Sequence, residues 1–235
     1  MTDTARDVDA ERRRSAQAAL EDVRPGMKLG LGSGRTAAHF VRALGERVRG
    51  GLSVIGVPTS DKTAELARAE GIPLATLNEQ PVLDLVVDGA DEVDRQLRLI
   101  KGGGGALLRE KIVASAARRM IVVVDEAKVV DALGAFPLPI EIVPFGATPV
   151  QLAIERTVSR LGLSGSMRWR QAGERLYLTD GGNHILDVSL GRIDEPERLA
   201  QELDTMPGVV EHGLFIGFAS LVIVAGSAGV ARLSK

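Results

Sequence analysis

One stretch of the sequence combines glycines with side chains that can move protons. Lys101 is followed by four glycines, Gly102 to Gly105, and Glu110 lies on the predicted helix that leaves them. Four consecutive glycines cost conformational entropy, so they suit a backbone that wraps a ligand or shifts when one binds. A cation and a carboxylate here suit proton abstraction beside a carbonyl, with Glu110 as base and Lys101 stabilising the oxyanion. The alternative is a flexible linker before a helix with surface charges.

A second stretch, Asp88-Gly89-Ala90-Asp91-Glu92, places two carboxylates three residues apart beyond an apolar run. Asp88 and Asp91, separated by small residues, can both face one cavity. They could bind sugar hydroxyls or move protons during ring opening. A magnesium site and a solvated acidic turn remain alternatives.

A third stretch, Gly32-Ser33-Gly34-Arg35-Thr36, lies between a predicted strand and a predicted helix. Glycines allow close approach of a ligand, and a helix start offers free N–H groups to an anion. Ser33 and Thr36 add hydroxyl donors, so the turn suits a phosphate monoester. Arg35 stands where a dinucleotide fingerprint needs glycine, and no Walker lysine follows. A plain tight turn with a helix cap is the alternative.

The remaining polar residues do not form a metal site. The chain has no cysteine, and His39, His184 and His212 are not spaced as zinc ligands. We expect these histidines to be structural or on the surface, and we expect neither a metal nor a cofactor. The Arg12-Arg13-Arg14 run is most simply a solvated helix face, from which one arginine could reach a phosphate.

Several polar clusters share one position relative to the predicted strands. Each follows an apolar run, and ligands of open α/β sheets bind beyond the carboxyl ends of the strands. We therefore expect five loops to converge on one rim: Gly32–Thr36, Thr59–Asp61, Asp88–Asp91, Lys101–Gly105 and Asp125–Lys128.

The order of the predicted elements indicates two domains. Up to about residue 130, strands alternate with helices, which is typical of a mostly parallel α/β sheet. The pattern then becomes α+β, and the apolar segment 221–233 is predicted to return to the first domain. The expected division is 1–130 plus 211–235 for the catalytic domain and 131–210 for the smaller one.

Composition excludes several classes of function. The 235 residues carry a formal net charge of −2, which favours neither nucleic acid nor an acidic membrane as partner. The charged amino-terminal segment has no apolar core, so no signal peptide is predicted, and no apolar run is long enough to span a bilayer. Together with the absence of cysteine, this favours a cytoplasmic protein.

These motifs together resemble the ribose-5-phosphate isomerase type A family. GLGSGRTAAHF is similar to its GxGTGSTAxxF segment, with Ser33 in place of threonine and Arg35 in place of serine. The other resembling segments, in family order, are VPTSDKTAELA, VDGADEVD, KGGGGALLREK, TDGGNHILDV and PGVVEHGLF. The resemblance covers nearly the whole chain.

The resemblance implies a Rossmann-like domain with a smaller ferredoxin-like domain, a homodimer or homotetramer, and isomerisation of ribose 5-phosphate without metal through an enediolate. Glu110 corresponds to the proton-transferring base, and Asp88, Asp91 and Lys101 to residues that open the ring and stabilise the oxyanion. The positions implied to hold substrate or phosphate are Ser33, Gly34, Arg35, Thr36, Gly89, Ala90, Gly102, Gly103, Gly104, Lys128 and Arg12.

Two alternatives belong to other classes. A non-catalytic sugar-phosphate-sensing module would need the phosphate turn but not Lys101 with Glu110, and would normally accompany a DNA-binding helix-turn-helix, for which no segment is evident. An amino-sugar phosphate deaminase or a CoA-transferase relative is the enzymatic alternative.

Overall fold

The computed structural model describes residues 7–234, which form two compact units. The first consists of residues 7–90, 112–129 and 218–234, and the second of residues 91–111 and 130–217. This division differs from the sequence-based boundaries at segments 91–111 and 211–217 and at residue 130. The physical reason is strand pairing, because β5 (Leu99–Ile100) and β13 (Leu214–Phe215) are hydrogen-bonded neighbours.

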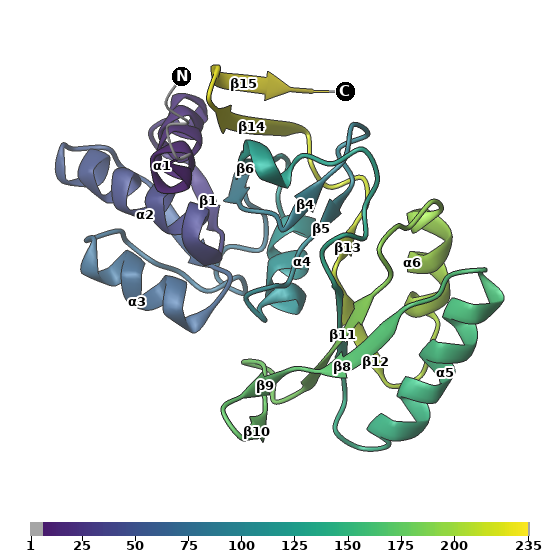
Figure 1. Ribbon diagram of the computed structural model, residues 1–235. Coiled ribbons are helices and arrows are strands. Elements are labelled where there is room, and N and C mark those ends of the chain that lie inside the picture. Colours follow the sequence, from purple (N-terminus) through teal and green to yellow (C-terminus); the bar gives the residue numbers. More distant parts are fainter. Residues whose placement is uncertain (1–6, 235) are drawn as a thin grey trace. The chain divides into compact units, whose positions relative to one another are not determined.

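A six-stranded sheet lies at the centre of the first unit, in the order β15-β14-β6-β3-β1-β2 (Figure 1). Five strands are parallel, and only the edge strand β15 is antiparallel, paired with β14 in a hairpin. The strands are β1 (Lys28–Leu31), β2 (Ile55–Pro58), β3 (Leu85–Asp88), β6 (Met120–Asp125), β14 (Leu221–Gly226) and β15 (Gly229–Leu233). This confirms the mostly parallel α/β sheet, to which the last segment contributes β14 and β15.

Helices cover this sheet because their apolar faces need burial. Phe40 and Leu44 of α2 (Gly34–Arg49) are fully buried in one core with Leu29 and Leu31 of β1. Burial of each such side chain stabilises the fold by roughly 1.5–3 kcal/mol. The other helices of the unit are α1 (Val8–Ala19), which packs on β6 and β14, the 3₁₀ turns η1 (Leu20–Asp22) and η2 (Glu126–Lys128), and α3 (Asp61–Ala69).

The second unit contains a four-stranded antiparallel sheet, in the order β12-β7-β11-β8. Its chain order is strand, helix, strand, strand, helix, strand, which is the split βαβ arrangement of ferredoxin-like folds. The elements are β7 (Leu138–Ile142), α5 (Ala147–Arg160), β8 (Ser166–Trp169), β11 (His184–Ser189), α6 (Pro196–Asp204) and β12 (Val209–His212). Ile154 of α5 and Leu203 of α6 are fully buried in the same core as strand residues Ile142 and Leu186.

A smaller three-stranded sheet, β13-β5-β4, also belongs to the second unit. It joins β5 and β13 to β4 (Glu92–Val93), and its pairings are antiparallel. The expectation that loop 101–105 ends a strand of the parallel sheet is therefore wrong. The strand that precedes the loop, β5, is paired with β4 and β13 instead.

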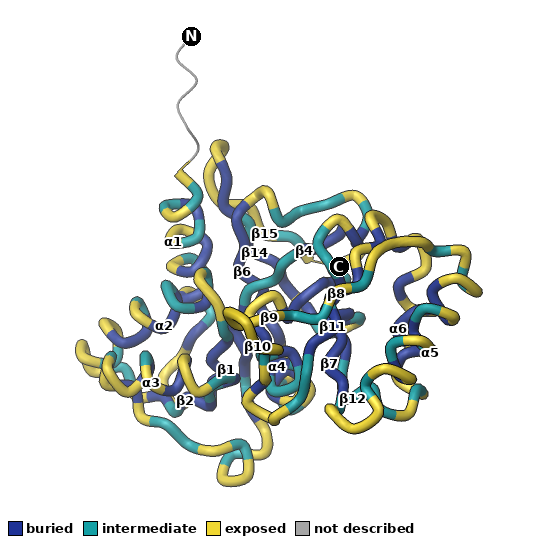
Figure 2. Tube along the Cα trace, turned by 60° about the horizontal axis from the view of Figure 1, so that its bottom comes forward, coloured by how far each residue is buried: buried dark blue, intermediate teal, exposed yellow. Residues whose placement is uncertain are grey.

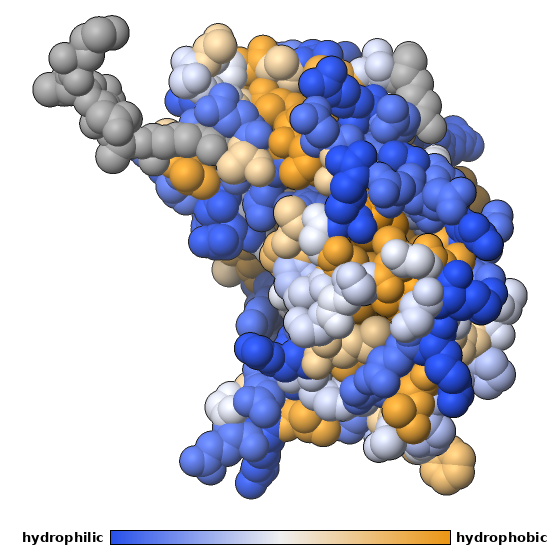
Figure 3. Space-filling view, turned by 45° about the vertical axis from the view of Figure 1, so that its right-hand side comes forward, coloured by the Kyte–Doolittle hydropathy of each residue, from blue (hydrophilic) through white to orange (hydrophobic). Residues whose placement is uncertain are grey.

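The second unit also carries one exposed hairpin, β9 (Gln171–Ala172) with β10 (Arg175–Leu176). Figure 2 shows this hairpin as exposed, whereas β7 is buried along its whole length. On the face drawn in Figure 3, hydrophobic side chains form separate patches among hydrophilic ones. No helix within residues 7–234 is long and apolar enough to cross a membrane.

Candidate active site

The turn after β1 gathers four hydroxyl side chains. Ser33 Oγ lies 2.6 Å from Thr59 Oγ1 and 3.0 Å from Ser60 Oγ, while Thr63 Oγ1 donates to Gly32 O at 3.1 Å. Ser33 is the N-cap of α2, but its side chain is not used for capping. The first N–H groups of α2 lack intrahelical partners and, with the helix dipole, favour an anion there.

Asp88 joins this turn to the end of β3. Its side chain is buried, and Oδ1 accepts hydrogen bonds from Ser33 N at 3.0 Å and Gly89 N at 2.8 Å. Gly32 is required here, because a Cβ at that position would lie 2.2 Å from Asp88 Oδ1. The predicted residues Ser33, Asp88 and Gly89 thus share one edge of the first unit's sheet.

Two further predicted residues of this turn begin α2 itself. Arg35 is exposed, and Thr36 is partly buried. Arg35 forms no ion pair with any residue in the described range, so its guanidinium is open to an external anion.

A buried carboxylate at the end of β6 holds Arg12. Asp125 Oδ2 lies 3.2 Å from Arg12 Nε, and the exposed fractions of the two side chains are 2% and 12%. Asp125 Oδ1 accepts from Ala127 N at 3.2 Å, which caps the turn that carries Lys128. Asp125, expected on this loop but not as a site residue, therefore supports two predicted phosphate-binding residues, Arg12 and Lys128.

In the second unit, the predicted acid–base pair is in contact. Lys101 Nζ lies 3.3 Å from Glu110 Oε2, and both side chains are almost completely buried. Lys101 is fixed by its backbone, which donates to Gly213 O at 2.9 Å, and Glu110 lies in the first turns of α4 (Leu107–Ser115). Lys101 Nζ also lies 5.5 Å from the centre of the buried Phe215 ring.

The glycine loop between these two residues is held in a defined conformation. Asp91 Oδ2 accepts from Gly103 N at 2.7 Å, and Gly105 N donates to Gly102 O at 3.0 Å. A Cβ on Gly103 would lie 2.7 Å from Asp91 Oδ1, whereas a Cβ on Gly104 would meet no atom within 4 Å. The open side of the loop is therefore at Gly104. Among the predicted residues, the second unit brings together Asp91, Lys101, Gly102, Gly103, Gly104 and Glu110.

Lys111, next to Glu110, anchors the start of α4. Its Nζ donates to Glu211 Oε1 at 2.5 Å and to His212 O at 2.9 Å, and it lies 5.0 Å from the Phe215 ring centre. Burial lowers the pKa of Lys111, and the Glu211 carboxylate opposes that shift. The sequence alone does not single out Lys111, because its partners lie about a hundred residues away along the chain.

His212 lies beside two acidic residues, Asp204 and Glu211, that resemble a metal-ligand set. Leu214 N donates to His212 Nδ1 at 3.2 Å, so Nε2 carries the proton and donates to Asp204 Oδ1 at 2.9 Å. Both ring nitrogens are thus engaged with protein groups. Burial and the nearby Lys111 ammonium lower the pKa of His212. These contacts assign a structural role to the histidine.

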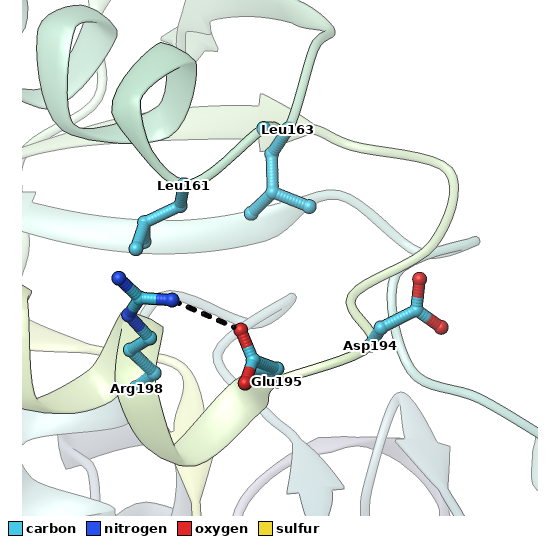
Figure 4. A pocket seen from close by; sticks show the side chains of 6 residues that line it. Leu161, Leu163, Asp194, Glu195 and Arg198 are labelled. Atoms are coloured by element: carbon cyan, nitrogen blue, oxygen red, sulfur yellow. Dashed lines mark hydrogen bonds and ion pairs between the residues drawn. The ribbon is translucent and has the colours of Figure 1, made fainter.

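A cavity elsewhere in the second unit does not contain the predicted residues. It has a volume of about 290 Å³ between the end of α5 and the start of α6. Figure 4 shows its lining side chains, among which Arg198 is paired with Glu195 at 3.2 Å. With no buried charge aimed into it, this cavity is a weaker candidate site than the two clusters above.

Comparisons with known proteins show the family of this chain. The family model described as ribose 5-phosphate isomerase A (phosphoriboisomerase A) matches residues 55–229. Ribose-5-phosphate isomerase A of Rhizobium etli is 59% identical over 220 residues, covering 94% of this chain and 95% of the relative. The protein of the same name from Rhizobium meliloti is 60% identical over 221 residues, covering 94% and 96%.

Solved structures give the same result. A D-ribose-5-phosphate isomerase in complex with phospho-erythronic acid has a TM-score of 0.90 and 40% identity, covering 97% of this chain and 100% of that one. Ribose 5-phosphate isomerase from Plasmodium falciparum has a TM-score of 0.92 and 32% identity, covering 97% and 99%. The family model, the similar relatives and the shared fold therefore place this chain in the ribose 5-phosphate isomerase A family.

Proposed function

We propose that this protein interconverts ribose 5-phosphate and ribulose 5-phosphate through an enediolate, without a metal ion. The observation that carries the proposal is the buried contact between Lys101 Nζ and Glu110 Oε2 at 3.3 Å, with Lys101 directly before the glycine loop and Glu110 on the helix that follows it. A carboxylate and an ammonium in a site of low dielectric are what proton transfer beside a carbonyl requires.

The proposed reaction proceeds on the open-chain sugar. The Glu110 carboxylate removes the proton from C2, and the electrons of that C–H bond move to form the C1–C2 double bond and place negative charge on O1. The Lys101 ammonium stabilises this charge. Protonated Glu110 returns the proton to C1, and the O2 proton moves to O1, which gives the 2-ketose. Atoms and charge are balanced, and no oxidant is needed.

Asp88 and Asp91 are proposed to assist ring opening, in which a proton leaves the anomeric hydroxyl and one is delivered to the ring oxygen. In the structure each carboxylate already accepts backbone N–H groups, from Ser33 and Gly89 for Asp88 and from Gly103 for Asp91. Those hydrogen bonds fix the direction of each carboxylate before substrate binds.

The phosphate group is proposed to bind at the start of α2. Support comes from the Ser33 hydroxyl cluster, the open guanidinium of Arg35, Thr36, and Arg12 and Lys128 beside Asp125. We propose that the sugar phosphate approaches the backbone closely at Gly34, Gly89 and Ala90. Its C1–C2 end is proposed to contact the glycine loop at Gly102, Gly103 and Gly104.

A direct assay tests the proposal. Purified protein is mixed with ribose 5-phosphate in excess EDTA, and ketose formation is followed by its absorbance after derivatisation. We expect conversion to ribulose 5-phosphate at an undiminished rate. Binding without conversion would support a non-catalytic sugar-phosphate-binding module instead. Loss of activity on chelation, restored by a divalent ion, would refute the metal-free mechanism.

We further propose that the enzyme acts in the cytoplasm, in the pentose phosphate pathway, as a homodimer or homotetramer. The cysteine-free composition suits a reducing compartment. The second unit exposes apolar side chains that a partner copy could cover, including Phe145, which is 94% exposed, and Leu152. Light scattering coupled to size-exclusion chromatography tests the assembly, and a monomer at micromolar concentration would contradict it.

A further inference from the structure

One arginine holds the glycine loop through its carbonyl groups. Arg170 Nη1 donates to Gly102 O at 2.8 Å and to Gly103 O at 3.2 Å. Two further N–H groups face Asp187, with Nε to Oδ2 at 2.9 Å and Nη2 to Oδ1 at 2.5 Å. A bidentate pair of this kind fixes the plane of the guanidinium, so both carbonyls meet a rigid donor.

The neighbouring side chain completes the clamp. Arg170 lies 5.9 Å from the centre of the Tyr177 ring, and Tyr177 Oη lies 3.5 Å from Gly104 O. A Cβ on Gly105 would lie 2.3 Å from Tyr177 Oη, so this position of the loop requires glycine. Three consecutive loop carbonyls therefore point toward Arg170 and Tyr177.

The direction of the carbonyls determines the direction of the N–H groups. No peptide bond within the described residues is cis, so each C=O is opposed by the N–H of the next residue. Gly102 O points at Arg170, and Gly103 N–H points the other way, to Asp91 Oδ2. By the same rule, the hydrogen bond from Arg170 Nη1 to Gly103 O directs Gly104 N–H away from Arg170.

Gly104 N–H is the donor that this clamp leaves available. No residue in the described range accepts a hydrogen bond from it, Gly104 is exposed, and the space around its Cα is open. Lys101 and Glu110 lie in the same unit, Lys101 directly before the loop and Glu110 on the helix α4 that follows it. A fixed N–H group on an open backbone is suited to an oxygen that gains negative charge.

We infer that Arg170, held by Asp187, is a positioning residue for the isomerase reaction, which orients the 103–104 peptide so that Gly104 N–H donates to an oxygen of the enediolate. This inference rests on the proposed function. In this role Arg170 itself does not contact the reacting atoms, because four of its five N–H groups are occupied by Asp187 and the two carbonyls. Its effect is exerted through the backbone.

The test replaces the guanidinium and separates binding from turnover. In Arg170→Met the loop carbonyls lose their donor, and we expect kcat to fall between tenfold and a hundredfold while KM changes less than threefold. This range lies below the roughly 10²–10³-fold cost of deleting an oxyanion donor, because the donor is displaced rather than removed. The inhibition constant of phospho-erythronic acid, whose planar carboxylate resembles the enediolate, should rise by a similar factor.

Matched variants separate positioning from general structural damage. Arg160 forms a bidentate pair with Glu202 between α5 and α6, at 2.8 and 2.9 Å, and Arg160→Met should leave kcat unchanged. Arg170→Lys should recover part of the activity, because one ammonium can hold a carbonyl but not the whole plane. Asp187→Asn keeps Arg170 but weakens the bidentate pair that orients it, so its kcat should lie between those of Arg170→Met and the wild type. This variant provides the test if Arg170→Met does not fold.

The outcomes distinguish this inference from the proposed function. A wild-type protein that does not convert ribose 5-phosphate would refute the proposed function itself. An active wild type with Arg170→Met as active as Arg160→Met would refute only the positioning role. A rise in KM alone, with kcat and the inhibition constant of phospho-erythronic acid unchanged, would also overturn it.

Discussion

Lys101 Nζ and Glu110 Oε2 face each other at 3.3 Å, with only 3% and 6% of their side chains exposed. Removing one partner of such a buried pair leaves the other charge uncompensated. For Glu110 the chemical consequence is direct. Glu110→Gln keeps the shape of the side chain but cannot accept the C2 proton, so we expect kcat to fall about 10²–10⁴-fold with a modest change in KM. Steady-state kinetics check this, and a variant with near-normal kcat would show that another group is the base.

Lys101→Met removes the ammonium but keeps an apolar chain against Phe215. If Lys101 meets charge that develops only in the transition state, kcat should fall by at least about a hundredfold and KM should change little. Thermal melting of the same variant shows whether the fold is kept. A rise in KM with unchanged kcat would assign Lys101 to ground-state binding instead.

Asp88→Asn and Asp91→Asn test the ring-opening roles. Each asparagine retains an oxygen for the backbone N–H groups but loses the carboxylate, so we expect turnover to slow about tenfold or more. Asp94 is a matched control, because it is buried and accepts from Gln96 N and Arg98 N within its own turn. Asp94→Asn should lower the melting temperature while kcat of the folded protein is retained. Equal effects of all three substitutions on kcat would contradict the assignment.

Arg35 is one of the two positions, with Ser33, at which this chain departs from the family segment. A guanidinium at a helix start is unfavourable by the helix dipole, and a bound phosphate dianion reverses that. Arg35→Ser should raise KM for ribose 5-phosphate several-fold with little change in kcat, and the difference should shrink as salt rises. Arg42→Ser, an exposed position on the same helix, is the control. Unchanged KM at low ionic strength would mean that Arg35 faces water.

The ends of the long buried strands could be predicted from the sequence. β3 and β6 are wholly buried, so each is an apolar run that ends visibly at an aspartate, Asp88 or Asp125. The hydroxyls of Ser33 and Thr36 could be predicted in the same way, because they follow the end of the apolar strand β1. The positions of Lys101 and Glu110 could be proposed from the glycines between them.

Other features have no local signature. β4, β5 and β13 are two residues each, too short for a period of hydrophobicity, and their pairing depends on long-range contacts. Arg170 acts on backbone carbonyls that any residue possesses, and its partner Asp187 lies seventeen residues further along the chain. Such a residue is recognised only when the structure shows Arg170 in contact with both the glycine loop and Asp187 of β11.

The buried imidazole of His212 predicts a pH dependence of stability. Burial, reinforced by the Lys111 ammonium, lowers its pKa below 6.5, while Asp204 and Glu211 oppose the shift. As the pH falls below 6.5, His212 therefore becomes protonated in the unfolded chain before it does so in the folded protein. The free energy of unfolding then decreases as the pH falls, by at most about 1.4 kcal/mol per pH unit from this group. Above pH 6.5 both states are neutral at His212 and the contribution vanishes. His212→Gln removes the titration, so the variant should lose less stability than the wild type between pH 7 and 5, as measured by urea unfolding at each pH. Parallel curves for the two proteins would mean that other groups govern stability in this window.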